Sequence, residues 1–312
     1  MSKNLKAQFH YVIENNFKPG MDKHSMKHQD YKSEVRGTKI FSYSDRQNLI
    51  NTSAHLANWL KEAHPEVKMV RDIRSKHIQE YLNKNSVGWT KATVELRMSH
   101  LRKLETLANN TFKGSEVKFT HDLVKPAGND PTRIMPMSRS DYNRLLVAMK
   151  DSESAGKTAF ELAGRFGLRV SETTKLQYRD ITEKEDGTMN LHIHNSKGGH
   201  SRDIQVGKPA DIQYLKELVV GHQGDSIDRV VPIQDDSVNK FINRTMEKAG
   251  IDEYRDASTS IHALRKMVAQ ELYDELRLEG KGRNEALDEV SKFLGHGKDR
   301  EACISRYVSN IY

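Results

Sequence analysis

The chain has 312 residues, of which 36% are hydrophobic and 30% charged, and its formal net charge is +7. This length predicts two domains, each with a core of its own. No apolar run approaches the roughly 20 residues that cross a bilayer, and the N-terminus lacks the features of a signal peptide. The single cysteine, Cys303, excludes a disulfide framework and a cysteine-rich zinc site. We therefore expect a cytoplasmic protein without a membrane partner.

The basic charge is concentrated in the first third of the chain. Residues 1–112 contain 19 Lys and Arg against 11 Asp and Glu, whereas the remainder contains 31 against 32. This asymmetry indicates a module that grips a polyanion, joined to a near-neutral module with another task. A basic solvated surface without a specific partner explains the composition equally well.

Apolar periodicity predicts helices in the basic part of the chain. One amphipathic helix is expected over 3–16, followed by a loop or arm to residue 40. Further helices are expected to start near Ser42 or Ser44, near Ser75 and near Thr90, each at a residue that suits a helix start. We expect 1–40 to be an N-terminal helix and arm of unassigned role, and 41–112 to be a helical domain.

The helix predicted from Thr90 has an apolar face and a basic face. In an arbitrary protein, a basic stripe is more often a solvated face than a binding surface. Here basic faces recur on several helices of one basic domain, which favours contact with phosphates. The expected phosphate-binding side chains are Lys91, Arg97, His100, Arg102 and Lys103.

Residues 113–137 contain three of the seven prolines together with Gly and Asn, which is typical of a linker. A second domain is then expected over 138–312. Its one clear β signal is at 189–206, where two alternating runs flank a glycine-rich turn. Helices are predicted around it, at 155–166, 210–219, 235–249, 258–279, 284–293 and 299–309, with one more beginning at Ser138 or Ser140. The expected fold class is mainly α with a small antiparallel β-sheet.

Four short motifs in this second domain carry groups that suit phosphate chemistry. In Gly167-Leu168-Arg169-Val170-Ser171-Glu172, the arginine lies at a helix junction, where Glu172 can hold it for bidentate phosphate binding. The alternative is a pair that only fixes the turn. Lys197 lies at the tip of the predicted hairpin, where exposed lysines are common and usually have no special role.

His262 and Arg265 are three residues apart and share a helix face near an N-terminus, where anions are favoured. A surface histidine and arginine are an equally good explanation. Leu294-Gly295-His296 forms a turn, and Tyr307 follows eleven residues after the histidine. A lone tyrosine is usually a half-buried aromatic with a polar tip.

Other catalytic or metal sites find little support. The sequence contains no GxxxxGK[ST] or HExxH motif. His192 and His194 alternate on a strand without a nearby cysteine or carboxylate cluster. Glu183, Glu185 and Asp186 lie in a turn and do not resemble a two-metal site, so no metal is expected.

Taken in order, these motifs resemble the tyrosine recombinase (phage integrase) family. GLRxSE, a hairpin lysine, HxLR, LGH and a late tyrosine follow one another at spacings similar to the family's. Residues 41–112 resemble its core DNA-binding domain, and 138–312 its catalytic domain. The resemblance implies a clamp around double-stranded DNA with a specific target site. It also implies a site-specific recombinase that uses no metal, ATP or other cofactor.

The resemblance also implies a role for each residue. Tyr307 would attack a backbone phosphate and form a 3′-phosphotyrosine. Arg169 and Arg265 would stabilise the phosphate charge, and Lys197 would protonate the leaving 5′-oxygen. His262 would act as general acid and base, His296 as a hydrogen-bond donor, and Glu172 would orient its neighbours.

The spacings from Arg265 to His296 and from His296 to Tyr307 are slightly long for the family, and only five residues follow Tyr307. Tyr312 therefore stays open as the nucleophile, although Tyr307 is favoured because it falls within a predicted helix. The resemblance implies a homotetramer on two DNA sites, with accessory DNA-bending proteins as further partners. It would serve a phage or mobile element, in the bacterial nucleoid or a phage-infected cell. The alternatives are a type IB topoisomerase and a non-catalytic DNA-binding protein of the same fold.

Overall fold

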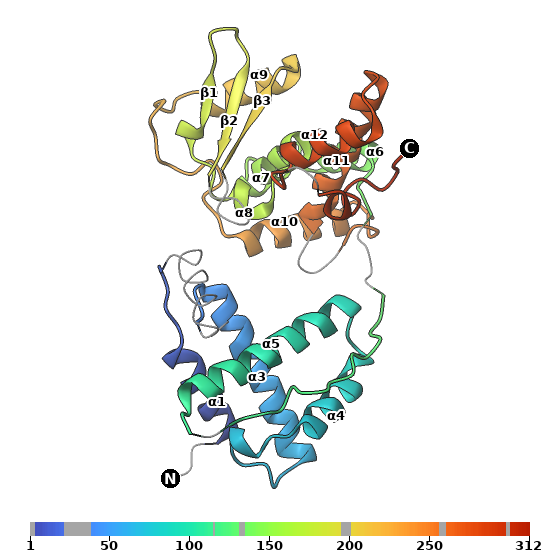
Figure 1. The fold of residues 1–312 in the computed structure, drawn as a ribbon. Coiled ribbons are helices and arrows are strands. Elements are labelled where there is room, and N and C mark those ends of the chain that lie inside the picture. Colours follow the sequence, from blue (N-terminus) through green and yellow to red (C-terminus); the bar gives the residue numbers. More distant parts are fainter. Residues whose placement is uncertain are drawn as a thin grey trace. The chain divides into compact units, whose positions relative to one another are not determined.

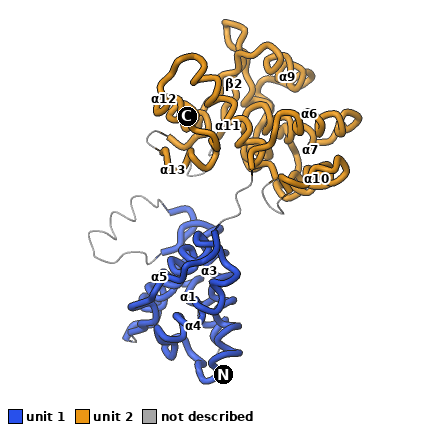
Figure 2. The backbone as a smooth tube through the Cα atoms, turned by 90° about the vertical axis from the view of Figure 1, so that its right-hand side faces the viewer, with its two compact units in different colours: residues 1–132 blue, residues 133–312 orange. Residues whose placement is uncertain are grey.

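The computed structural model describes residues 4–21, 39–114, 116–130, 135–194, 201–255, 260–297 and 300–312. The chain forms two compact units, Met1–Thr132 and Arg133–Tyr312, which are coloured separately in Figure 2. Each unit has its own hydrophobic core. Within the described residues, no helix has the length and apolar character needed to cross a bilayer.

Unit 1 is helical (Figure 1). Its elements are α1 (Leu5–Asn15), α3 (Tyr43–Ala63), the short 3-10 helix η1 (Val70–Asp72), α4 (Ser75–Ser86) and α5 (Lys91–Thr111). Ser42 and Thr90 cap α3 and α5, because each side chain accepts a hydrogen bond from the backbone three residues later. α1 packs against α3 and α5 and buries Phe9, so the N-terminal helix is part of this core.

The stretch expected to be a linker begins as part of unit 1. Val117 and Phe119 are buried in its core. Glu105 accepts hydrogen bonds from the backbone and hydroxyl of Thr120, and Asn109 pairs in both directions with the backbone of Val117. Proline and glycine thus mark irregular backbone here, but side chains of α5 hold that backbone in place.

Unit 2 is mainly helical with one small sheet (Figure 1). Strands β1 (Ile181–Glu183), β2 (Met189–Ile193) and β3 (Arg202–Val206) form an antiparallel sheet in the order β1-β2-β3. The fold class predicted from the sequence is therefore confirmed. The predicted hairpin is β2 and β3, whereas β1 was missed because three residues are too few to show an alternating pattern.

The helices of unit 2 enclose a core built around α11. They are α6 (Arg139–Ala148), α7 (Ala155–Phe166), α8 (Val170–Thr173), η2 (Tyr178–Asp180), α9 (Pro209–Val219), α10 (Asp235–Lys248), α11 (Ser260–Leu278), α12 (Arg283–Phe293) and α13 (Glu301–Ile304). α11 packs against α7, α10 and α12. The helix predicted over 299–309 was wrong in extent, since α13 ends at Ile304 and Tyr307 lies in the turn that follows it.

Candidate active site

The first component of the site is the junction between α7 and α8. Gly167 ends α7 in a left-handed conformation with φ of +61°, which glycine adopts without strain. Arg169 then occupies the N-cap position just before α8. Both its backbone N–H and its guanidinium Nη1 donate to the Glu172 carboxylate, at 2.9 and 2.6 Å. The local pairing of Arg169 with Glu172 that the sequence indicated is present.

Glu172 is the centre of a larger cluster of arginines. Arg202 donates to it with both terminal nitrogens, at 2.8 and 2.9 Å, and Nη1 of Arg265 lies 3.7 Å from it. Burial alone would raise the pKa of Glu172, but the hydrogen bond and charge of Arg202, the charge of Arg265 and the backbone N–H of Arg169 hold it well below its usual range. Three guanidinium groups therefore share one carboxylate.

Arg265 is fully buried on α11. It donates to the backbone carbonyls of Gly167 and Leu294, and so connects the α7–α8 junction to the Leu294-Gly295-His296 turn. Burial and the charge of Arg169 lower its pKa, against the opposing charge of Glu172. A buried cation among other cations gains from a bound anion, which is the situation expected at a phosphate site.

His262, His296 and Tyr307 complete the cluster. The ring centroid of Tyr307 lies 5.8 Å from that of His262 and 5.2 Å from that of His296. The guanidinium carbon of Arg265 lies 5.5 Å from the same tyrosine ring. Segments far apart in the sequence thus bring two histidines and an arginine around one half-buried tyrosine.

The imidazole of His296 bridges two neighbours. Its Nε2 lies 3.0 Å from Nη2 of Arg169, and its Nδ1 lies 3.5 Å from Sγ of Cys303. A guanidinium can only donate, so Nε2 must be the acceptor. A neutral His296 therefore carries its proton on Nδ1, facing Cys303.

Tyr312, the other tyrosine considered, lies in different surroundings. Its ring packs edge-on against Tyr273 at 5.7 Å and under Arg277 at 5.6 Å. Tyr273 is eight residues beyond Arg265 on α11, which corresponds to about 12 Å along the helix. The cluster of arginines and histidines therefore surrounds Tyr307 rather than Tyr312.

Lys197 lies outside the described residues. The strands on either side of it are described, and Ile193 of β2 pairs with Arg202 of β3. Arg202 itself was missed by the sequence analysis. An arginine at the start of a strand usually reaches solvent. The only sequence signal for Arg202 is its position on the second strand of the predicted hairpin. The burial of its side chain, 9% exposed, depends on residues distant in the chain.

The five residues expected to bind DNA from α5 do not share one face. Lys91 and Arg102 are exposed, whereas Arg97 and Lys103 are half-buried. Arg97 donates to Thr52 Oγ1 at 2.7 Å, and Lys103 to Asp45 at 2.6 Å. The placement of His100 on the basic face was wrong: it is 7% exposed and its Nδ1 lies 2.9 Å from Thr52 Oγ1. Burial lowers its pKa, so it is neutral at pH 7.

His64, Glu66 and His77 form the one candidate metal-binding group in the described part of unit 1. Their nitrogens already have partners. Those of His64 lie 3.3 and 2.8 Å from Glu66 and Glu80, and Nδ1 of His77 accepts from the backbone of Arg74. A neutral His77 then carries its proton on Nε2, which blocks that nitrogen as a ligand. These contacts favour an ion-pair network over a metal site.

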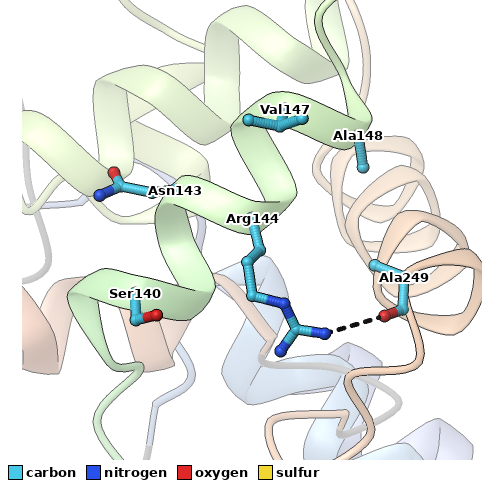
Figure 3. Close-up of a pocket in the computed structure, with 6 residues that line it drawn as sticks. All are labelled: Ser140, Asn143, Arg144, Val147, Ala148 and Ala249. Carbon is cyan, nitrogen blue, oxygen red and sulfur yellow. Dashed lines mark hydrogen bonds between the residues drawn. The ribbon is translucent and has the colours of Figure 1, made fainter.

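A pocket of about 530 Å³ lies beside α6 (Figure 3). It is lined by Ser140, Asn143, Arg144, Val147, Ala148 and Ala249, and Arg144 donates to the carbonyl of Ala249 across it. No residue of the arginine–histidine–tyrosine cluster lines this pocket, so it is not the candidate active site.

Comparison with solved structures gives the same architecture for the chain. A λ integrase tetramer bound to a Holliday junction matches with a TM-score of 0.61 and 19% identity, over 91% of this chain and 76% of that chain. XerH recombinase bound to difH substrate in a pre-cleavage complex matches with a TM-score of 0.62 and 15% identity, over 97% and 90%. The Tn1549 transposon integrase in complex with transposon right-end DNA matches with a TM-score of 0.55 and 12% identity, over 91% and 95%. At these identities the likeness shows the fold.

Family membership comes from the sequence itself. Residues 136–311 match the model of the phage integrase family, which is more than half of the chain, and no curated protein matches significantly. The chain belongs to the phage integrase family. It is a site-specific tyrosine recombinase that acts on DNA, as the order of its motifs predicted. The two alternatives, a type IB topoisomerase and a non-catalytic DNA-binding protein, are not favoured.

Proposed function

We propose that Tyr307 is the nucleophile of this recombinase and that its oxygen attacks a DNA backbone phosphate. The observation that carries this proposal is the position of its ring, 5.2 to 5.8 Å from His296, Arg265 and His262. A tyrosine beside two histidines and a buried arginine has both charge stabilisation and proton carriers at hand. Tyr312 has neither histidine beside it among the described residues.

Arg169 and Arg265 stabilise the negative charge that develops on the non-bridging phosphate oxygens. Their support is the charge balance of the site, where three guanidinium groups share the Glu172 carboxylate. Three guanidinium groups around one carboxylate make this group net positive, which suits a phosphodiester entering a largely buried site. Glu172 holds the arginines in position and does not face the phosphate.

The proton steps belong to the histidines and to Lys197. His262 takes the proton from Tyr307, and Lys197 protonates the 5′-oxygen as it leaves. His296 donates a hydrogen bond to a phosphate oxygen once its Nε2 is released by Arg169 and carries the proton. Attack forms the bond from tyrosine oxygen to phosphorus and breaks the bond from phosphorus to the 5′-oxygen. The resulting 3′-phosphotyrosine keeps the energy of the phosphodiester, so a 5′-hydroxyl can reverse the step without ATP.

The assembly follows from the need to exchange strands between two duplexes. We propose a homotetramer on two specific DNA sites, serving a phage or other mobile element and acting at the bacterial nucleoid. In support, a structural neighbour of this chain is a λ integrase tetramer bound to a Holliday junction. Unit 1 contributes phosphate contacts from α5 through the exposed Lys91 and Arg102. We further propose that accessory DNA-bending proteins assist synapsis.

Covalent capture tests this function on DNA of any sequence. The full-length protein is incubated with nicked duplexes of randomised sequence. The short fragment that cleavage releases diffuses away, so its 5′-hydroxyl cannot reverse the reaction and the covalent adduct accumulates. Adducts are separated under denaturing conditions and their DNA is sequenced. We expect one sequence to be enriched, Tyr307→Phe to form no adduct, and Tyr312→Phe to form it normally. Failure to enrich any sequence would contradict the catalytic role, and loss of adduct only in Tyr312→Phe would move the nucleophile.

A further inference from the structure

Gln270 lies on α11, five residues beyond Arg265, and its side chain contacts the segment that follows Tyr307. Its Oε1 accepts hydrogen bonds from the backbone N–H groups of Ser309 and Asn310, at 2.8 and 2.9 Å. Its Nε2 donates to the carbonyl of Asn310 at 3.0 Å. Three hydrogen bonds thus join one side chain to the backbone of two consecutive residues.

A neighbour on the same helix fixes the orientation of this amide. Nε2 of Gln270 also donates to Oδ1 of Asp274, four residues later, at 3.0 Å. An ionised carboxylate can only accept, so the amide nitrogen faces Asp274 and the amide oxygen faces the two backbone N–H groups. The side chain of Gln270 therefore presents a matched acceptor and donor to the segment beyond Tyr307.

The backbone around Tyr307 has little regular structure to hold it. α13 ends at Ile304, and both Tyr307 and Val308 donate their N–H groups to the carbonyl of Ile304. Beyond Val308 the chain is in neither helix nor strand, and the next two N–H groups are those that Gln270 accepts. Because backbone N–H groups need partners, an irregular segment of this kind depends on side chains for its position.

Tyr307 is therefore held from the side of α11. Val308 is buried in the core that α11 and α12 share, and Gln270 fixes the backbone that begins two residues after the tyrosine. The same helix carries His262 and Arg265, which lie beside the tyrosine ring. A shift of this segment would change the distance from the tyrosine to these groups without moving the groups themselves.

We propose that Gln270 is a positioning residue that holds Tyr307 at the distance and orientation needed for attack on the phosphate. This inference rests on the proposed role of Tyr307 as nucleophile. Gln270 acts through the backbone of Ser309 and Asn310, not on the phosphate. Loss of its amide leaves the arginines and histidines in place and lets the tyrosine oxygen shift. A shift of about 1 Å in a reacting group costs on the order of 10²-fold in rate.

Single-turnover adduct formation on DNA of the captured sequence gives the first measurement. Gln270→Met removes the hydrogen-bonding groups at nearly the same side-chain length. We expect this variant to form the adduct about 10²-fold more slowly than wild type at saturating DNA, with unchanged affinity for DNA. Gln213→Met is the matched control, because Gln213 is an exposed glutamine of α9 whose amide donates to Glu217. It should form the adduct at the wild-type rate.

A reaction that bypasses the tyrosine shows whether the defect lies in its position. DNA that ends in a 3′-p-nitrophenyl phosphate already carries an aryl group in place of the tyrosine. A 5′-hydroxyl attacks the phosphorus, forms the phosphodiester, and releases p-nitrophenolate and its own proton. This joining uses the arginines and histidines but not Tyr307. In Tyr307→Ala, which leaves space for the aryl group, the further change Gln270→Met should leave the joining rate unchanged.

The other outcomes separate the inference from its basis. Adduct formation by Gln270→Met at the wild-type rate would overturn the positioning role, while the loss of adduct in Tyr307→Phe would still support the nucleophile. A joining reaction that Gln270→Met slows as much as adduct formation would overturn the role as well, since the amide would then support the whole site. If Tyr307→Phe still forms adducts, the assignment of the nucleophile fails and the inference falls with it. Should Gln270→Met fail to fold, Gln270→Asn, whose amide is one methylene closer to α11, is judged by the same comparison.

Discussion

Nη2 of Arg169 donates to Nε2 of His296 at 3.0 Å, across 127 residues of sequence. Two groups expected to bind the same phosphate are thus bonded to each other. This bond assigns the remaining proton of a neutral His296 to Nδ1, where Sγ of Cys303 lies at 3.5 Å. The state of the Cys303 thiol therefore affects His296, which we propose binds the reacting phosphate.

Alkylation of Cys303 should block DNA cleavage. A carboxamidomethyl group on Sγ would fill the space beside Nδ1 of His296 and displace the imidazole from Arg169. Cys303 is the only cysteine of the chain, so iodoacetamide labels one site, and mass spectrometry gives the stoichiometry. We expect the labelled protein to lose adduct formation more than about tenfold, as for loss of a catalytic hydrogen bond.

The matched control is Cys303→Ala treated in the same way. It should form adducts at a similar rate with and without iodoacetamide. Undiminished cleavage by fully labelled wild-type protein would show that the contact with His296 has no catalytic consequence.

Replacing Glu172 by Gln should destabilise unit 2 in a pH-dependent way. The folded-state pKa of Glu172 is depressed, so its charge stabilises the fold above the unfolded-state pKa, and this contribution is lost as the pH falls toward the folded-state value. At pH 7 we expect Glu172→Gln to lower the unfolding free energy by about 3 kcal/mol, as for a buried ion pair that loses one partner. Below about pH 4.5 the difference in unfolding free energy between Glu172→Gln and wild type should shrink.

Both tryptophans, Trp59 and Trp89, belong to unit 1, so their fluorescence does not report on this loss. Amide hydrogen exchange in unit 2, monitored as urea increases, measures the unfolding free energy of that unit. The tryptophan fluorescence transition reports on unit 1 and serves as an internal control. If the difference in unfolding free energy between Glu172→Gln and wild type is constant from pH 7 to pH 4, the Glu172 carboxylate does not have the assigned charge.

The sequence predicted those parts of the fold and site that depend on local chemistry. Ser42 and Thr90 cap helices because their hydroxyls reach backbone groups three residues away, and Arg169 pairs with Glu172 at the same spacing. The burial of the Arg202 and His100 side chains escaped prediction for the opposite reason. Their partners, Glu172 and Thr52, lie 30 and 48 residues away, and polar residues are buried only when such distant partners exist.

The end of the chain shows the same limit. The sequence predicted a helix over 299–309, which includes Tyr307, but α13 stops at Ile304. Ile304 and Val308 are both buried in the core formed with α11 and α12. This anchoring holds Tyr307 in the turn between them, and it depends on packing against α11 and α12, which local sequence does not reveal.

Within α5, Arg102 and His100 should behave differently when DNA binding is measured. Arg102 is exposed, so Arg102→Gln should weaken binding and reduce the slope of log affinity against log salt by about 0.9, the value for one phosphate contact. His100→Gln should leave this slope unchanged, because the ring is buried against Thr52. Titrations of the captured target DNA over a range of salt concentrations give both slopes. A reduced slope for His100→Gln alone would mean that the imidazole, not Arg102, reaches the phosphates.

Close packing in unit 2 should make Gly164 intolerant of any side chain. A Cβ on Gly164 would lie 2.1 Å from Cε2 of Tyr142, which is buried and stacked on Phe160 with ring centroids 5.1 Å apart. Because the tyrosine cannot move without disturbing this core, we expect Gly164→Ala to cost about 3 kcal/mol of unfolding free energy, as for overpacking of a core. Gly207→Ala is the matched control, since no atom lies within 4 Å of its added Cβ. Hydrogen exchange in unit 2, monitored as urea increases, compares the unfolding free energies of Gly164→Ala and Gly207→Ala. Equal stability of both variants would mean that α6 and α7 can move apart without a loss of stability.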